Sequence, residues 1–211
     1  ITLLPGGKGQ VDIGNFSGQV TTSRVYHADG VNRPFEFDGT TLVPIVTGMS
    51  PNAPKYVRVH KQHLFLSFGS SALHSDPGFP YKYSAIGGAA EIATGDTITG
   101  MLVLPGSSTT AALAIICRNV SNILYGTSVS NWNLVNYSVS AGALPYTVQN
   151  LNQPMMLDDS SVFALSATLN YGNFTSASIT ERILTFIEQH RPYAWNSGLN
   201  HTKNQYRIFY S

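Results

Sequence analysis

Residues 56–68 read YVRVHKQHLFLSF and predict an antiparallel β-hairpin. Two runs rich in β-branched, aromatic and other apolar residues flank the polar pair Lys61-Gln62, and such runs on either side of a short polar turn are typical of paired strands. The expected strands are Tyr56–His60 and His63–Phe68. The rest of the chain repeats this pattern, so the hairpin indicates an all-β fold.

Three further turns have the same character. Asp38-Gly39, Arg118-Asn119 and Asp158-Asp159 each separate two short apolar runs, and these residue types favour tight turns. Successive antiparallel hairpins make meander sheets, which form the blades of a β-propeller or the layers of a sandwich. The other expected strands are Gln19–His27, Pro34–Phe37, Leu42–Thr47, Ile98–Leu104, Ala112–Arg118, Asn122–Thr127, Trp132–Val139, Met155–Leu157, Val162–Leu169 and Tyr206–Tyr210.

One segment has helical character. Ser178-Ile179-Thr180-Glu181 is a capping box, in which the first and last side chains bond to each other's backbone N–H groups. Apolar residues then recur at helical spacing as far as Ile187, and Pro192 stops the run. The pattern predicts one short helix at Ile179–Gln189, acting as a strut packed on a sheet.

The chain contains a weak internal repeat. Lys61–Ser67 resembles Lys203–Ser211, and each is a polar turn followed by a strand that ends aromatic–X–Ser. This similarity suggests corresponding hairpins of successive blades. The last strand, Tyr206–Tyr210, is followed by no further strand, so we expect it to lack a partner and the natural protein to continue.

The composition limits the class of protein. Of the 211 residues, 43% are hydrophobic and 11% charged, and the net charge is +1. Because a typical soluble domain is about 25% charged, we expect the surface to meet other subunits or to rely on Ser, Thr and Asn for solubility. The balanced charge excludes a basic or acidic tail protein.

No apolar run reaches the roughly 18 residues of a membrane span. There is no signal-peptide pattern, and the start at Ile1 predicts a processed or truncated chain.

The cysteine and histidine residues offer little chemistry. Cys117 is the single cysteine, so a disulfide framework is excluded and a buried strand thiol is favoured over a catalytic one. His60 and His63 flank a turn and could approach across a hairpin, but no nearby carboxylate completes a metal site. We interpret them as turn-lining residues.

His74, Ser75 and Asp76 are adjacent in sequence, and this adjacency is no support for a catalytic triad, whose members are brought together by the fold. Asp76-Pro77-Gly78 is predicted to be a turn in which Asp76 accepts local N–H groups.

The carboxylates do not form an evident catalytic pair. Asp158 and Asp159 are neighbours in a turn and would diverge, whereas a glycosidase needs two carboxylates that face each other. Glu91 and Asp96 lie in the small-residue stretch 87–96, GGAAEIATGD, which lacks the phosphate-binding glycine motifs. Close backbone packing is the expected role of that stretch. We therefore predict no catalytic, cofactor-binding or metal-binding residues and no cofactor.

Aromatic side chains could form a sugar-stacking platform, although residues spread over many strands more often fill sheet faces. They are not interleaved with Arg or Lys, so a single-stranded nucleic-acid platform is disfavoured. The candidates are Tyr81, Tyr83, Trp132, Tyr137, Tyr146, Tyr171 and Trp195.

Sequence blocks in a fixed order carry a resemblance to a known family. They are residues 31–40 VNRPFEFDGT, 56–67 YVRVHKQHLFLS, 87–92 GGAAEI, 96–100 DTITG, 123–128 ILYGTS, 131–132 NW, 141–146 AGALPY, 157–159 LDD, 171–174 YGNF and 203–207 KNQYR. Over about residues 18–211 the chain resembles the β-propeller virion proteins of tailed bacteriophages. It is similar to the tail tubular protein B, or nozzle, family of short-tailed phages, which includes the packaged-DNA stabilisation proteins.

This resemblance implies a fold and a role. The fold would be β-propeller blades within residues 1–211, forming one domain or a fragment of one, because members of the family are longer. The subunits would form a homo-oligomeric ring in the virion, in contact with other tail and neck proteins. DNA would pass through the ring without sequence-specific binding. The family has no catalytic residues to carry over.

The sequence therefore favours a structural virion protein, a tail tube or nozzle component that forms part of the DNA exit channel. A glycan- or receptor-binding tail module is the alternative, and it requires Trp132, Trp195 and the tyrosines on one exposed face. A sugar hydrolase comes last because it requires two facing carboxylates.

Overall fold

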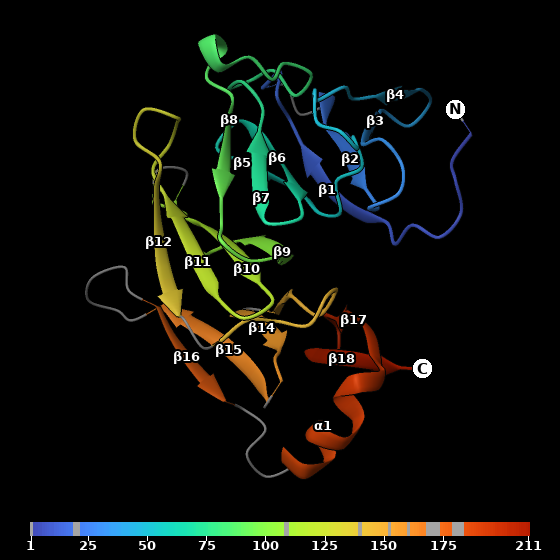
Figure 1. The fold of residues 1–211 in the computed structure, drawn as a ribbon, viewed down its shortest axis with the longest axis vertical. Helices are drawn as coiled ribbons and strands as arrows, with labels where there is room; N and C mark the ends of the chain where they lie inside the picture. Colours follow the sequence, from blue (N-terminus) through green and yellow to red (C-terminus); the bar gives the residue numbers. More distant parts are fainter. Residues whose placement is uncertain are drawn as a thin grey trace. The chain divides into compact units, whose positions relative to one another are not determined.

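The computed structural model describes residues 2–18, 22–107, 110–138, 141–151, 153–159, 161–167, 174–178 and 184–211. Its described residues form four antiparallel sheets of four strands and one sheet of two strands (Figure 1). In every sheet, strands that are neighbours in sequence are neighbours in space. Each sheet is therefore a meander, as the turn pattern predicted.

The first two sheets contain β1 (Gln10–Gly14), β2 (Arg24–Ala28), β3 (Phe35–Phe37) and β4 (Leu42–Pro44), then β5 (Val57–His60), β6 (His63–Phe68), β7 (Ser71–His74) and β8 (Ala90–Ala93). The third sheet contains β9 (Ile98–Val103), β10 (Leu113–Cys117), β11 (Ser121–Tyr125) and β12 (Asn133–Ser138). The remaining strands are β13 (Gln149–Leu151), β14 (Gln153–Leu157), β15 (Val162–Ala167) and β16 (Phe174–Ser178), then β17 (Ala194–Asn200) and β18 (Gln205–Tyr210).

All four predicted hairpins are confirmed: β3–β4, β5–β6, β10–β11 and β14–β15 are antiparallel pairs. The hairpin of residues 56–68 turns at Lys61 and Gln62, which have positive φ angles of 47° and 62°. Two left-handed residues in succession match the twist of paired strands, which explains how so short a turn joins β5 to β6.

Several strands were not predicted, and one expectation was wrong. The strands β1, β7, β8, β13, β16 and β17 were missed; β8 reads AEIA and β17 reads AWNSGLN, so each has little of the β-branched signal. The final strand, predicted to lack a partner, pairs with β17 through Gln205–Tyr210. Pairing with β18 therefore makes Ala194–Asn200 a strand, although its residues have only a weak local preference for strand structure.

The repeat between Lys61–Ser67 and Lys203–Ser211 has a structural counterpart. The first segment forms the turn and second strand of the β5–β6 hairpin, and the second segment does the same in β17–β18. Each hairpin begins its own sheet. The two segments therefore hold corresponding places in their hairpins, but the expectation of successive blades was wrong, because the sheets β9–β12 and β13–β16 lie between them in chain order.

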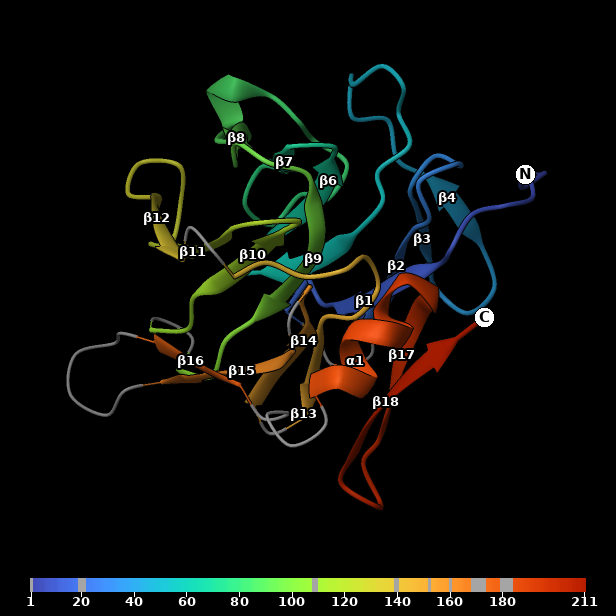
Figure 2. The same cartoon turned by 60° about the horizontal axis from the view of Figure 1, so that its bottom comes forward.

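The helix α1 spans Leu184–His190. It confirms the C-terminal half of the predicted Ile179–Gln189, while residues 179–183 lie outside the described residues. Ile187 is its buried residue and packs in a cluster with Leu157 and Val162. Figure 2 shows α1 beside β17 and β18, so it is the predicted strut. No described helix has the length and apolarity needed to cross a membrane.

The chain forms two compact units. The first comprises Ile1–Ile98, Ser108–Thr110 and Tyr125–Asn133, and the second comprises Thr99–Ser107, Ala111–Leu124 and Leu134–Ser211. In the first unit, Tyr26 and Ala28 on β2 pack with Val57 on β5 and with Leu64 and Leu66 on β6. These apolar contacts join its two sheets into one core.

Candidate functional site

A small polar pocket lies beside β2 in the first unit. Its volume is about 220 Å³. Both aromatic and polar side chains contribute to its walls. The lining residues are Phe16, Ser17, Thr22, Arg24, Tyr26, Glu36 and Pro80.

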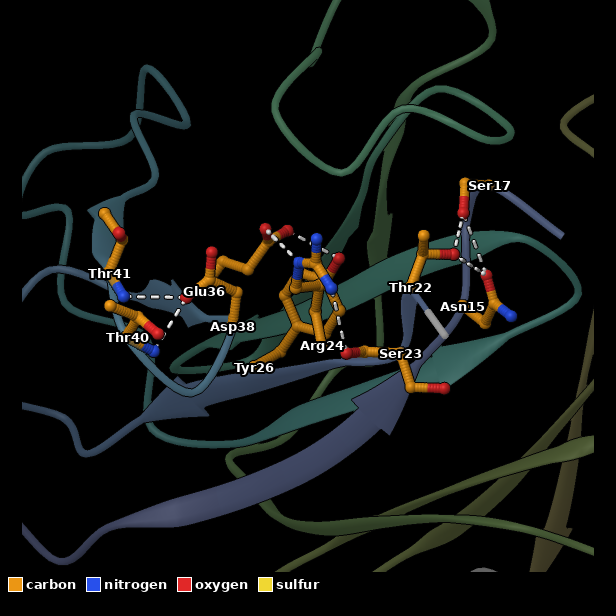
Figure 3. Close-up of polar contacts among 10 residues, drawn as sticks. All are labelled: Asn15, Ser17, Thr22, Ser23, Arg24, Tyr26, Glu36, Asp38, Thr40 and Thr41. Atoms are coloured by element: carbon orange, nitrogen blue, oxygen red, sulfur yellow. Dashed lines mark hydrogen bonds and ion pairs between the residues drawn. The ribbon is translucent and has the colours of Figure 1, made fainter. Parts of the chain in front are cut away.

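Strand register brings the charged pair of this pocket together. Tyr26 on β2 is the direct partner of Glu36 on β3, so both side chains project from the same face. Arg24 lies two residues before Tyr26 and shares that face because side chains alternate along a strand. The Tyr26 hydroxyl donates to Glu36 Oε2 at 2.7 Å, and Arg24 Nε lies 3.5 Å from Glu36 Oε1 (Figure 3).

Glu36 is the centre of this polar group. Tyr81, from the β7–β8 loop, also lies close enough for the Glu36 carboxylate to act on its hydroxyl. Burial, then the hydrogen bond to the Glu36 carboxylate and its charge, raises the pKa of both Tyr26 and Tyr81. The two phenols therefore stay neutral, and that of Tyr26 donates to Glu36. The Glu36 side chain is 13% exposed and that of Arg24 is 30% exposed, so the ion pair still reaches the pocket.

Hydroxyl groups line the neighbouring wall. Ser17 Oγ and Thr22 Oγ1 each lie 3.2 Å from Asn15 Oδ1 and also lie within hydrogen-bond distance of each other, so the three groups share two hydroxyl protons. Phe16 stands between these polar residues in sequence and packs edge-on against Tyr26, with ring centroids 5.4 Å apart. The pocket therefore combines an aromatic wall with several hydroxyl and carboxylate groups.

No sequence motif pointed to this pocket. The available signal was Glu36 between Phe35 and Phe37 in a predicted strand, which places a carboxylate on one sheet face. Its partners Arg24 and Tyr26 lie on a different strand. Only the pairing register, which the sequence leaves open, shows that these groups converge.

The predicted Asp38-Gly39 turn lies close to this pair. Asp38 Oδ1 accepts the backbone N–H groups of Thr41 at 2.7 Å and Thr40 at 2.8 Å (Figure 3). These hydrogen bonds, with that of Thr41 first, lower the pKa of Asp38. The carboxylate thus remains charged and stabilises the turn.

A second cluster groups three histidines on the β5–β7 face. His60 and His63 are direct partners across the turn, and His74 is the partner of Phe65, so these side chains share one face. The ring centroids of His63 and His74 are 4.7 Å apart, and Trp132 lies 5.9 Å from His74. The approach of His60 and His63 that the hairpin allowed is confirmed.

Burial keeps these histidines neutral. It lowers the pKa of His60 and His74 to about 4 and also lowers that of His63. His63 Nδ1 lies 2.6 Å from the carbonyl oxygen of Ser75, which can only accept, so the ring donates there. The described residues contain no group of three His, Cys, Asp or Glu side chains placed to hold a metal ion.

The remaining sequence candidates have structural partners. Asp158 and Asp159 lie in the predicted β14–β15 turn, and Asp159 Oδ1 pairs with Arg118 at 2.6 Å and with Arg191 at 3.7 Å. The Asp76-Pro77-Gly78 turn forms as predicted, but the Asp76 carboxylate accepts the N–H of Ser84 and not a local one. That expectation was wrong because the long β7–β8 loop folds back over the turn.

The stretch 87–96 also has the expected packing. A Cβ atom at Gly87 would overlap the carboxylate of Asp76, so the backbone approaches closely there. Glu91 lies exposed on β8, and Asp96 follows in the turn before β9 and is half-buried. Neither carboxylate lines a described pocket.

Cys117 is buried on β10, as predicted.

The aromatic residues considered as a sugar-stacking platform are divided between the two units. Trp132 is half-buried against the histidine cluster of the first unit, whereas Trp195 is 48% exposed on β17 of the second. Tyr171 lies outside the described residues.

Comparison with known proteins identifies the fold. No family model matches the sequence, and no curated protein matches it. The structure is similar to the crystal structure of BBS1N in complex with ARL6DN, soaked with mercury, with a TM-score of 0.53 and 17% identity over 80% of this chain and 53% of that chain. The fold is that of a β-propeller. A lead-soaked crystal of the same complex matches with a TM-score of 0.41 and 12% identity, over 80% of this chain and 66% of that chain.

In a β-propeller, each four-stranded meander is a blade. The sheets β1–β4, β5–β8, β9–β12 and β13–β16 are blades, and β17–β18 is a two-stranded sheet. This chain spans about half the length of the BBS1N chain that it matches at the higher TM-score. The polar pocket lies on the blade β1–β4, and the histidine cluster lies on the blade β5–β8.

Proposed function

We propose that this chain is a structural component of a tailed-phage virion, a subunit of the tail tube or nozzle through which DNA leaves. The observation that carries the proposal is the series of propeller blades, each a four-stranded meander. Apart from residues 171–173, which lie outside the described residues, the sequence blocks that resemble the nozzle family lie in the strands, turns and loops of this fold. Residues 56–67 contain nearly all of the β5–β6 hairpin, and residues 203–207 contain the end of the turn before β18 and its first three residues.

The charge of the chain supports a passive conduit. It has 12 Lys and Arg residues against 11 Asp and Glu residues. Tight DNA binding depends on many Lys and Arg contacts to phosphates. A nearly neutral chain lets DNA slide past, and the channel lining should carry no dense basic cluster.

Exposed apolar residues support assembly with other subunits. Ile86, at the tip of the β7–β8 loop, is fully exposed, and Phe79 in the same loop is 54% exposed. Large apolar side chains that gather on one loop often mark a protein contact. This agrees with the low proportion of charged residues, which leaves much of the surface suited to burial between subunits.

The mass of the assembled protein tests this proposal. We expect the full-length protein to form a closed homo-oligomer in native mass spectrometry and to be present in purified phage particles. Ile86→Asp should lower the oligomer fraction, while Thr202→Asp, at an exposed turn residue of the second unit, should not. A protein that stays monomeric in solution and is absent from the particles would overturn the proposal.

Glycan binding is the second candidate function. The polar pocket beside Arg24 and Glu36 favours it, because hydroxyl, carboxylate and guanidinium groups converge there beside an aromatic wall. The two functions are compatible, since a tail subunit can also contact a surface sugar.

A further inference from the structure

We propose that the pocket beside Arg24 and Glu36 binds a single neutral sugar ring. The inference concerns the second candidate function and does not depend on assembly into a ring. Its residues come from the segment before β2, from β2 and β3, and from the β7–β8 loop, so the blade fold itself builds the pocket.

The volume of the pocket selects a small ligand. At about 220 Å³ it is smaller than the roughly 300–1,000 Å³ of drug-sized sites. A pyranose ring fits that space, whereas an oligosaccharide would have to extend out of it. Pro80 is buried at the pocket and Phe16 is half-buried, so both supply rigid apolar surface. The apolar C–H face of a sugar ring can pack against this surface.

The charges of the pocket favour a neutral ligand. The positive charge of Arg24 is balanced by Glu36 at 3.5 Å. Asp38, held ionised by Thr40 and Thr41, adds a negative charge within electrostatic range of Arg24. An acidic sugar would be repelled by the excess of carboxylates, so a neutral ligand is favoured over an anionic one.

The hydrogen-bonding capacity matches vicinal hydroxyl groups. The Arg24 guanidinium has five N–H donors, of which Glu36 and the Ser23 carbonyl take two. The Glu36 carboxylate has about four acceptor positions, and Tyr26 and Arg24 occupy two. A sugar hydroxyl can therefore accept from Arg24 and donate to Glu36 at the same time.

The hydroxyl wall adds directional contacts. Ser17 and Thr22 are held in place by Asn15 Oδ1, so their oxygens are ordered before a ligand arrives. Preordered groups lower the entropy cost of binding. A single ring still buries little area, so we expect a roughly millimolar Kd.

Titration by NMR tests the proposal. Methyl α-D-glucopyranoside, methyl α-D-mannopyranoside and methyl β-D-galactopyranoside are added separately to the ¹⁵N-labelled chain, with glycerol as the control polyol. We expect saturable shifts of the Phe16, Ser17 and Arg24 amides with at least one sugar. N-acetylneuraminic acid, which is anionic, should bind at least tenfold more weakly.

Two variants separate the pocket from the fold. Thr22→Val keeps the side-chain shape and removes the hydroxyl, and Glu36→Gln removes the charge; each should weaken sugar binding about tenfold. Glu91→Gln, at an exposed β8 carboxylate, should bind as the wild type does, and unchanged spectra outside the pocket will confirm folding.

The proposal is overturned if no sugar shifts the pocket amides at tens of millimolar, if glycerol shifts them equally, or if both pocket variants bind normally. None of these results would bear on oligomerisation, so this failure is distinct from that of the assembly proposal.

Discussion

The indole nitrogen of Trp132 donates a hydrogen bond of 3.1 Å to Nε2 of His74. Because Nε2 accepts, the proton of the neutral imidazole must be on Nδ1, which lies 3.1 Å from the carbonyl oxygen of Ser75. One tryptophan thus fixes both the tautomer and the uncharged state of a fully buried histidine. The contact joins residues 58 positions apart.

Trp132→Phe should therefore destabilise the protein. The variant keeps an aromatic ring but leaves His74 Nε2 without its donor in a buried site, and such a loss costs about 1–3 kcal/mol. Urea unfolding at pH 7 measures the change. Trp195→Phe is the matched control, because Trp195 is 48% exposed and its replacement should cost less. Equal losses for the two variants would contradict the role given to this hydrogen bond.

Stability should fall as the pH is lowered from 7 to 5. The pKa of His60 and His74 is about 4 in the folded protein and 6.5 in the unfolded chain, because burial disfavours the charged ring. The unfolded state therefore binds more protons in this range, so the free energy of unfolding rises with pH and is lost on acidification. The expected loss is roughly 2 kcal/mol per histidine by pH 5.

Urea unfolding between pH 7 and pH 5 gives that slope, and His74→Gln should flatten it. Most carboxylates titrate below this range, so they contribute little. A free energy of unfolding that stays constant from pH 7 to 5 would show that the histidines are not held neutral.

Gly87→Ala should disturb the β7–β8 loop. The new Cβ would overlap the Asp76 carboxylate, which is only 5% exposed and accepts the N–H of Ser84. Overpacking of this kind costs about 1–3 kcal/mol. A double-mutant cycle with Asp76→Ala checks the cause, since removal of the carboxylate should make Gly87→Ala nearly neutral. If the cost is the same in both backgrounds, Asp76 is not what excludes a side chain at Gly87.

Cys117 should resist thiol reagents in the native state. Its side chain is 0% exposed, and all five residues of β10 are buried. Reaction with Ellman's reagent must then wait for the strand to open, so labelling should become fast only in urea. Ser70→Cys, at an exposed turn between β6 and β7, should provide a second thiol that reacts within seconds. Rapid labelling of two thiols in the native variant would contradict the burial of Cys117.

Local chemistry made much of the fold predictable. The turns at Asp38-Gly39 and Lys61-Gln62 lie between apolar runs, and turn preference depends only on neighbouring residues. The strand His63–Phe68 was predicted with both of its observed ends. In contrast, β17 has Asn196, Gly198 and Asn200 in place of β-branched residues, so nothing local marked it as a strand.

The sequence by itself determined an all-β chain of successive hairpins with one short helix and a buried thiol at Cys117, because these features depend on turn residues and apolar runs. The tertiary structure alone decided that Glu36 faces Tyr26 and that Trp132 bonds to His74. Register and the packing of distant segments create both contacts. A slip of one residue in the β2–β3 pairing would turn Glu36 to the opposite face without changing any local preference, so only the packed core fixes the pocket.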